Sequence, residues 1–459
     1  MTRPTTSDDA FDQPVGLADP EAVAAWDAMA LAFLAHGAAT PTHLGRLLEL
    51  APDHAAAHAV KGMFYALLGR RELMDDAATA LATARALAAE GAVLPRERGL
   101  IDALGHLLGG RPSAAVAALE AILAAAPADT LAMKLSHAIR FVIGDGAGMR
   151  RSVERVLPAY GADHRGRGYL LGCHAFALEE TGDYAAARLA GRAALTLAPD
   201  DAWGLHAVAH VHDMTGDAAG GLDWLSGREG AWAHCNNFRF HVWWHKALML
   251  LDLGRHDEAL ALYDGEVRAE RTDDYRDISN ATSLLSRLEL EGVDVGPRWE
   301  ELADLCERRT EDGCLIFADL HYLMALTGDD RDGAVARMMA RLERDAARAG
   351  NEVEDRMAVP GLDAARGLEA FGDGDYATAF DRLAAARPHM RRAGGSHAQR
   401  DVFERLTIDA GLRAGRLDDA QAILIDRTRR RGHEDGYAAA RHEMILSARR
   451  GPCPAEARA

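Results

Sequence analysis

The chain has 459 residues, and its 52 lysines and arginines against 70 aspartates and glutamates give a formal net charge of −18. So acidic a chain argues against binding to the phosphate backbone of nucleic acids or to an anionic membrane surface. Aromatic residues make up only 6% of a chain that is 49% hydrophobic, which argues against β-sandwich and barrel folds, because their strands are rich in aromatic and β-branched residues.

The N-terminal segment is polar and acidic and lacks the apolar centre of a signal peptide. We expect residues 1–20 to form a flexible tail. No stretch reaches the roughly 18 uncharged apolar residues of a membrane span. The five cysteines are scattered without a CxxC pair, which is typical of a reducing compartment. The sequence therefore predicts a cytoplasmic protein.

Regular turn signals follow along the chain. A glycine followed by aspartate or arginine, and soon by alanine, recurs between apolar segments, with spacings such as 34 residues from Gly182 to Gly216 and 41 from Gly374 to Gly415. A glycine here can end one helix in the left-handed conformation, and an aspartate can cap the next helix. This period is typical of tetratricopeptide repeats.

A second turn signal, an Ala-Pro-Asp pattern, recurs with the same repeat length. Ala-Pro-Asp at residues 51–53 and its variants at 126–129 and 198–201 lie 75 and 72 residues apart, which corresponds to two repeats each. Proline ends a helix, and the acid suits the next N-terminus. We therefore predict an all-α fold, an α-solenoid of tetratricopeptide-like helix–turn–helix repeats that is continuous over residues 21–450. Residues 451–459 are expected to form a C-terminal tail.

Histidines are concentrated within two predicted repeat helices. His206 and His210 lie four residues apart, so they project from one face of their helix, and Asp213 shares that face. His241 and His245 repeat the spacing about one repeat later. Because equivalent helices of adjacent repeats lie side by side, the four imidazoles could converge with the carboxylate of Asp213.

Such a convergence predicts a metal site, since imidazoles at positions i and i+4 can share one ion. Imidazole ligands suit zinc or iron, and a carboxylate makes manganese possible as well. His321 is a further candidate ligand, and Asp213 or Asp319 could act as ligand or general base. The alternative is a hydrogen-bonded histidine network that only orders the interior.

Two further features suggest a substrate pocket. Five of the seven tryptophans, among them Trp203 and Trp244, fall between residues 203 and 244, where they could wall a pocket or fill a widened core. Ser396 and Gln399 match a capping box, and the helix N-terminus that they begin could hold an anionic substrate group with the help of Arg400. The alternative at that position is a plain, well-capped helix.

These segments together resemble the tetratricopeptide repeat protein 38 family, in its bacterial form. The likeness is carried by Asp201 to Trp203 with His206, His210 and His212, by His241 with Trp244 and His245, by Phe317 with Asp319 and His321, and by residues 394–396 and 398–403. The resemblance implies a repeat-type α-solenoid over nearly the whole chain, and it assigns no reaction and no catalytic residues.

Two functions follow from these observations. The first is a metal-dependent enzyme in which a bound transition metal activates water or dioxygen on a small molecule in the solenoid groove, by hydrolysis with zinc or oxidation with iron. The second is an interaction scaffold whose concave face binds a protein or peptide, with structural histidines and a preference for basic partners. P-loop, Rossmann, GxSxG and HExxH motifs are missing from the sequence, and the oligomeric state is left open.

Overall fold

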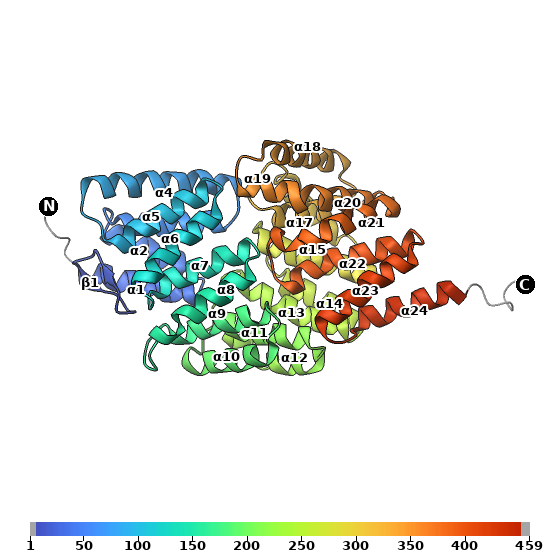
Figure 1. The fold of residues 1–459 in the computed structure, drawn as a ribbon, viewed down its shortest axis with the longest axis horizontal. Coiled ribbons are helices and arrows are strands. Elements are labelled where there is room, and N and C mark those ends of the chain that lie inside the picture. Colours follow the sequence, from blue (N-terminus) through green and yellow to red (C-terminus); the bar gives the residue numbers. More distant parts are fainter. Residues whose placement is uncertain (1–5, 451–459) are drawn as a thin grey trace, which may run out of the picture.

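A computed structural model describes residues 6–450. They form an all-α solenoid of antiparallel helix pairs (Figure 1), so the predicted fold class is confirmed. The only strands among the described residues are the short β1 (Ser7–Asp8) and β2 (Pro14–Val15), which pair antiparallel. Every helix in residues 6–450 is too short or too polar to cross a membrane.

The helices follow one another in pairs. The first part of the array comprises α1 (Pro20–Leu34), α2 (Thr40–Leu50), α3 (Ala55–Leu67), α4 (Arg71–Glu90), α5 (Pro95–Leu108), α6 (Pro112–Ala125), α7 (Thr130–Val142), α8 (Gly146–Val156), α9 (Arg167–Glu179), α10 (Tyr184–Leu197), α11 (Ala202–Met214) and α12 (Ala218–Leu225).

The second part comprises α13 (Phe238–Asp252), α14 (His256–Leu262), α15 (Tyr275–Leu290), α16 (Arg298–Glu307), α17 (Ile316–Gly328), α18 (Asp332–Arg348), α19 (Glu352–Arg356), α20 (Leu362–Gly372), α21 (Tyr376–Ala386), α22 (His397–Arg413), α23 (Leu417–Arg431) and α24 (Gly436–Arg450). Short 3-10 turns cover Leu157–Ala159, Glu229–Ala231 and Arg387–Ala393, and π turns cover Tyr263–Val267 and Met357–Gly361.

The predicted turn chemistry is present at the repeat junctions. Gly182 and Gly216 have φ angles of 84° and 69°, in the left-handed region where glycine is favoured. Asp183 and Asp217 then accept hydrogen bonds from the backbone of the next helix. The turn after α17 differs, because Gly328 still belongs to α17 and Asp330 takes the left-handed conformation instead.

Inner and outer helices differ in burial. The inner helices stack on one another in the order α9, α11, α13, α15 and α17. All residues of α11 are buried, whereas the outer α10 buries only Ala187, Gly191 and Ala194. In a repeat array with a filled interior, the inner helices are buried on all sides, and the outer helices bury only one face.

The array closes on itself, so that its early and late repeats touch (Figure 1). The polar contacts between residues distant in the sequence include Glu72 to Arg309 at 2.8 Å, Ser113 to Glu352 at 2.6 Å, Glu180 to the backbone of His397 at 2.7 Å, and Asp213 to Arg431 at 2.7 Å. A cleft of about 680 Å³ lies at this seam, between α3–α7 on one side and residues 311–316 and 341–357 on the other. The closure is what covers the inner helices.

The N-terminal tail requires a correction. The sequence predicted a flexible tail over residues 1–20, but from residue 6 on the segment packs against the first helices. Phe11 and Val15 are buried, and Asp9 forms an ion pair of 2.9 Å with Arg96 of α5. Apolar anchors and a buried ion pair hold the segment in place. Residues 1–5 and the tail predicted over 451–459 lie outside the described residues.

Candidate metal centre

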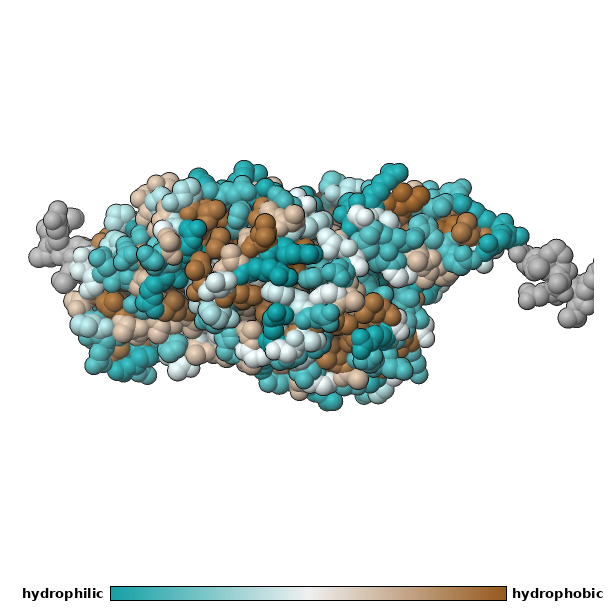
Figure 2. Space-filling model, turned by 90° about the horizontal axis from the view of Figure 1, so that it is seen from below, coloured by the Kyte–Doolittle hydropathy of each residue, from teal (hydrophilic) through white to brown (hydrophobic). Residues whose placement is uncertain are grey.

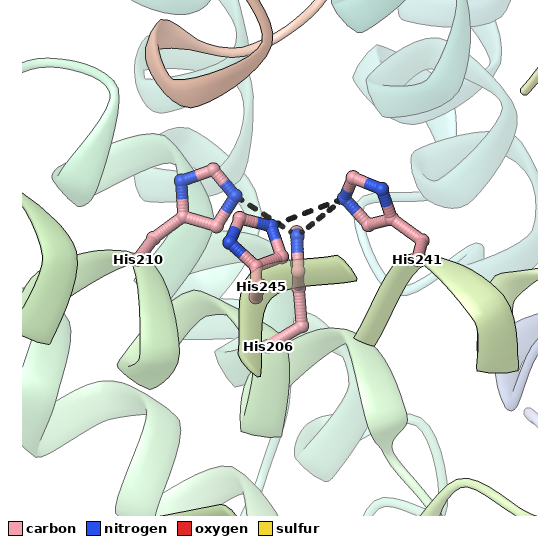
Figure 3. Close-up of side chains that lie close together, drawn as sticks. All are labelled: His206, His210, His241 and His245. Carbon is pink, nitrogen blue, oxygen red and sulfur yellow. Dashed lines mark hydrogen bonds between the residues drawn. The ribbon is translucent and has the colours of Figure 1, made fainter. Parts of the chain in front are cut away.

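Two neighbouring inner helices carry the four histidines. His206 and His210 project from α11 and His241 and His245 from α13, and all four rings point to one centre (Figure 3). The Asp201 side chain caps α11 by accepting a hydrogen bond from the backbone of Gly204. The four-residue spacing on each helix then places both rings on the side that faces the other helix.

The Nε2 atoms of the four rings lie close together. Nε2 of His206 is 2.9 Å from that of His210 and 3.0 Å from that of His241, and the His241 and His245 Nε2 atoms are 3.2 Å apart. One nitrogen from each ring lies within 4.8 Å of the other three. The predicted convergence of four imidazoles is therefore confirmed, while their role as metal ligands stays a prediction.

The opposite ring nitrogens of two histidines face polar side chains, and the hydrogen bond at His241 fixes the tautomer of that ring. Nδ1 of His241 donates a hydrogen bond of 3.0 Å to Oδ1 of Asn280 on α15. Nδ1 of His210 lies 3.5 Å from the carboxylate of Glu179 on α9. The proton held at Nδ1 of His241 leaves the lone pair of this ring at Nε2, which faces the common centre. Polar partners behind the ligating rings are a regular feature of histidine metal sites.

Burial keeps most of the cluster neutral. It lowers the pKa of His241 to about 3, and it lowers the pKa values of His206 and His245 well below the ordinary value of 6.5. His210 differs, since burial lowers its pKa but the Glu179 and Glu180 carboxylates outweigh this effect and raise it. The cluster thus offers lone pairs at neutral pH, with a carboxylate nearby to balance positive charge.

The donor set fits a transition-metal ion. Metal–nitrogen bonds of about 2.1 Å place adjacent ligand nitrogens about 3.0 to 3.4 Å apart, and the cluster has separations of 2.9 to 3.2 Å. Facing lone pairs repel one another unless a proton or a cation lies between them. The Nδ1 atoms of His206 and His245 are buried without a hydrogen-bond partner in residues 6–450.

Aromatic rings surround the cluster. The centroid of Trp203 lies 5.0 Å from that of His206, and Trp244 stacks on His241 at 5.2 Å with an angle of 18° between the rings. Phe176 of the neighbouring inner helix α9 stacks on His206 at 5.7 Å. This shell limits access of water to the four nitrogens. Whether Trp203 and Trp244 contact a substrate stays a prediction.

Asp213 does not complete the cluster. Its carboxylate forms an ion pair of 2.7 Å with Arg431 of α23. Asp213 shares a helix face with His206, but seven residues of helix separate them by about 10 Å along the axis. The prediction that this carboxylate converges with the imidazoles is corrected by that distance and by the arginine.

Asp319 and His321 lie elsewhere on α17. Both oxygens of Asp319 contact the guanidinium of Arg341, at 2.7 and 2.9 Å. His321 donates from Nδ1 to the carbonyl of Phe317 at 2.7 Å, and its ring packs against Phe403. Neither belongs to the four-histidine group. An ion pair and a backbone hydrogen bond account for both side chains.

The helix N-terminus at Ser396 already binds a carboxylate of the protein. The predicted capping box with Gln399 is present. The anion at this N-terminus is the carboxylate of Glu180, which accepts from the backbone of His397 at 2.7 Å and lies 3.3 Å from Arg400. The prediction that Arg400 holds a substrate group is therefore corrected, because an internal carboxylate has that place.

Several residues around the site were missed at the sequence level. Asn280 and Glu179 support His241 and His210 from other helices. A signal for Asn280 existed, since Ser279, Asn280, Thr282 and Ser283 form a polar run inside a repeat helix, and all four are buried. For Glu179 there was none, because acidic residues are common at helix ends.

Comparisons with known proteins complete the description. No protein-family model matches the chain. Among solved structures, the human IFIT1 dimer with m7Gppp-AAAA is 15% identical, with 85% of this chain and 89% of that chain covered and a TM-score of 0.39. The Naa15/Naa10 complex bound to HypK-THB is 13% identical over 88% and 68%, with a TM-score of 0.25.

A third similar structure is the P58(IPK) TPR domain, 17% identical over 76% of this chain and 89% of that chain, with a TM-score of 0.20. All three similarities are weak in sequence and in shape. The ligands and partners named for these proteins are therefore not transferred to this chain.

Proposed function

We propose that this chain is a helical-repeat protein that binds a transition-metal ion through the Nε2 atoms of His206, His210, His241 and His245. The observation that carries the proposal is the convergence of four imidazole nitrogens in a buried centre, where three pairs of Nε2 atoms are 2.9 to 3.2 Å apart. Asn280 and Glu179 hold the rings from behind, as partners of metal ligands do.

The ligand set favours certain metals. Imidazole suits zinc, copper, iron and nickel, and the loss of Asp213 from the site weakens the case for manganese. When bound, such a metal would act as a Lewis acid on water or on a small molecule at a free coordination position. The chain's own contribution is to orient the four rings, to exclude bulk water with Trp203 and Trp244, and to place the Glu179 carboxylate next to His210. A metal-dependent enzyme is the use that we propose for the centre.

Elemental analysis of the purified, tag-free protein tests the proposal. We expect a stoichiometric transition metal in the wild type and its loss in a His206→Ala/His245→Ala double variant. His43→Ala/His256→Ala, with two histidines outside the cluster, is the matched control and should keep the metal. No bound metal after loading with zinc, ferrous iron, copper or nickel would contradict the proposal.

A second function is supported by the repeat fold and by the outer surface. A groove of about 560 Å³ runs beside α24, lined by Leu290, Leu412, Ala440 and Met444 among others. Met444 is 51% exposed and Leu446 47%. Figure 2 shows apolar side chains gathered in several separate patches among hydrophilic ones on the face that it draws. Such surfaces suit a scaffold that binds a protein or peptide partner.

This second function has its own test. Met444→Asp should abolish capture of a partner by the purified protein, whereas His206→Ala/His245→Ala should keep it, because the groove and the cluster are separate. Equal capture by Met444→Asp and wild type would contradict a role for this groove.

Two finer assignments are also proposals. The residues quoted above support membership of the tetratricopeptide repeat protein 38 family. A cytoplasmic location is supported by the cysteines, since Cys173, Cys235, Cys306 and Cys314 are all free thiols.

A further inference from the structure

Two buried cations lack an acidic partner. Within residues 6–450, Lys134 on α7 and Arg287 on α15 are the only buried lysine or arginine side chains without a carboxylate oxygen within 4.0 Å of a side-chain nitrogen. The other buried cations all have such a partner, and they are Arg96, Arg268, Arg309, Arg341, Arg400, Arg405, Arg427, Arg431 and Arg441.

The contacts of Lys134 are neutral groups. Its Nζ atom lies 3.2 Å from Nε2 of His36 and 4.0 Å from the Cys173 sulfur, and 5.1 Å from the ring centre of Trp203. Lys134 is 3% exposed. Asp201 is an acid that interacts with Lys134 electrostatically. Burial raises the pKa of Asp201 to about 7, so its carboxyl group is only partly ionised at neutral pH.

Arg287 shows the same pattern on the other side of the cluster. It donates to the backbone carbonyls of Ser283 at 3.0 Å and of Ala398 at 2.6 Å, and its Nε has no partner among the described residues. Its guanidinium lies 5.6 Å from the ring centre of Trp244. Buried cations without an acid are costly, because desolvation of the charge is not offset by an ion pair.

Both cations lie directly behind the aromatic rings of the metal centre. Lys134 contacts the ring of Trp203, which is 5.0 Å from His206, and Arg287 contacts the ring of Trp244, which is 5.2 Å from His241. In a chain with 70 acidic residues, the two uncompensated buried cations flank the same four histidines. A bound metal would add further positive charge.

His36 connects Lys134 to the cluster. Its φ angle of 57° lies in the left-handed region, which is unusual for a residue other than glycine and is often retained at functional sites. The strained backbone places its ring against Phe238 at 4.5 Å and Trp203 at 5.4 Å, and both of these rings also contact His206. His36 and His241 are partly exposed, whereas His206, His210 and His245 are buried.

From this arrangement we infer that the metal centre takes a small anionic molecule, whose acid group binds the Lys134 ammonium beside His36 while the rest of the molecule lies toward the four histidines. Arg287 contributes a second positive charge from behind Trp244. The acid group of the ligand would supply the negative charge that Lys134 and Arg287 lack within the protein. The inference rests on the proposed function and names the class of its substrate.

Thermal unfolding of the zinc-loaded protein tests the inference. Acetate, succinate and inorganic phosphate are added at millimolar concentration, with chloride at equal ionic strength as the reference, because salts alone alter stability. We expect at least one of the three to raise the Tm of the wild type above the chloride reference, and the comparison of carboxylates with phosphate identifies the acid group.

Three variants make the test specific. Lys134→Met should keep its zinc, lose the anion-dependent rise in Tm, and be at least as stable as the wild type without anion, because an unpaired buried charge has been removed. Lys134→Arg keeps the charge and should keep part of the response. Lys61→Met, which alters a lysine outside the site, is the control and should behave as the wild type.

The outcomes separate this inference from the proposed function. The inference is overturned if none of the three anions exceeds chloride in the zinc-loaded wild type, or if Lys134→Met responds as the wild type does. If the protein binds no metal, the proposed function fails, and a Lys134-dependent response of the metal-free protein would show an anion site without a metal centre. Such a result would overturn the link to the metal.

Discussion

At the scale of single residues, the support behind each imidazole decides whether it can serve as a ligand. Asn280 accepts the Nδ1 proton of His241, so the lone pair of this ring is fixed at Nε2. The sequence predicted the ring but not its partner, because Asn280 lies 39 positions away on another helix. Spacing within one helix is visible in a sequence, whereas a hydrogen bond between helices is not.

Replacing Asn280 should weaken metal binding without removing a ligand. In Asn280→Leu the ring of His241 is free to rotate or to change tautomer, and we expect metal affinity to fall about 10- to 100-fold, as for other partners of this kind. Competition with a chromophoric chelator measures the affinity. Ser286→Ala, on the same helix, is the control, and equal affinities of Asn280→Leu and wild type would refute the role of Asn280.

His321 should make folding sensitive to acid. Burial lowers its pKa from 6.5 to about 4, so the unfolded chain takes up a proton at a higher pH than the folded chain. The stability that this difference contributes is present above about pH 6.5 and is lost as the pH falls toward 4, up to about 3 kcal/mol. His321→Leu should lose less stability over that range.

Urea unfolding at several pH values between 4 and 6.5 compares the His321→Leu variant with the wild type. His43→Leu, at a partly exposed position outside the core, serves as the control. Parallel pH profiles for His321→Leu and wild type would show that this histidine is not the group responsible.

At the scale of elements, helix caps set where each ligand-bearing helix begins. Asp201 accepts from the backbone of Gly204 and so starts α11 one turn before His206. The Ala-Pro-Asp pattern predicted this start correctly, since capping depends only on neighbours in the sequence. What the pattern did not show is that the cap is buried, which raises the pKa of Asp201 to about 7.

Two substitutions at Asp201 separate capping from charge. Asp201→Ala loses the cap and should destabilise the protein by about 1 kcal/mol. Asp201→Asn keeps an acceptor without the charge. Because the folded pKa is raised, the contribution of Asp201 to stability falls as the pH rises from about 4 through 7, and Asp201→Asn should lack this contribution. Thermal unfolding at several pH values between about 4 and 8 measures this, and an Asn variant with the wild-type pH dependence would contradict it.

At the scale of the whole molecule, closure of the array brings distant repeats into contact next to the histidine cluster. Glu180, in the turn after α9, binds both the N-terminus of α22 and the side chain of Arg400. The same carboxylate belongs to a group with Glu179 and His210. The contact between distant repeats thus reaches the edge of the histidine cluster.

Breaking this contact should be costly. Arg400→Met leaves the Glu180 carboxylate buried without its guanidinium, and we expect a loss of about 3 kcal/mol or more in unfolding free energy. The Glu180→Gln/Arg400→Met double variant should lose less than the two single changes together. Arg416→Met, which removes an exposed ion pair with Asp381, should cost under about 1 kcal/mol. Additive effects in urea unfolding would refute the coupling.

The sequence by itself determined the helical repeats, their turns and caps, and the two histidine pairs, because all of these depend on residues within about one helical turn of each other. Only the tertiary structure decided which side chains meet across the array. Asp213, Asp319 and Arg400 were candidates for the site and instead face Arg431, Arg341 and Glu180. The partners of Asp213 and Arg400 lie more than 200 residues away. A buried charge is neutralised by whichever opposite charge closure brings near, and no local pattern encodes that choice.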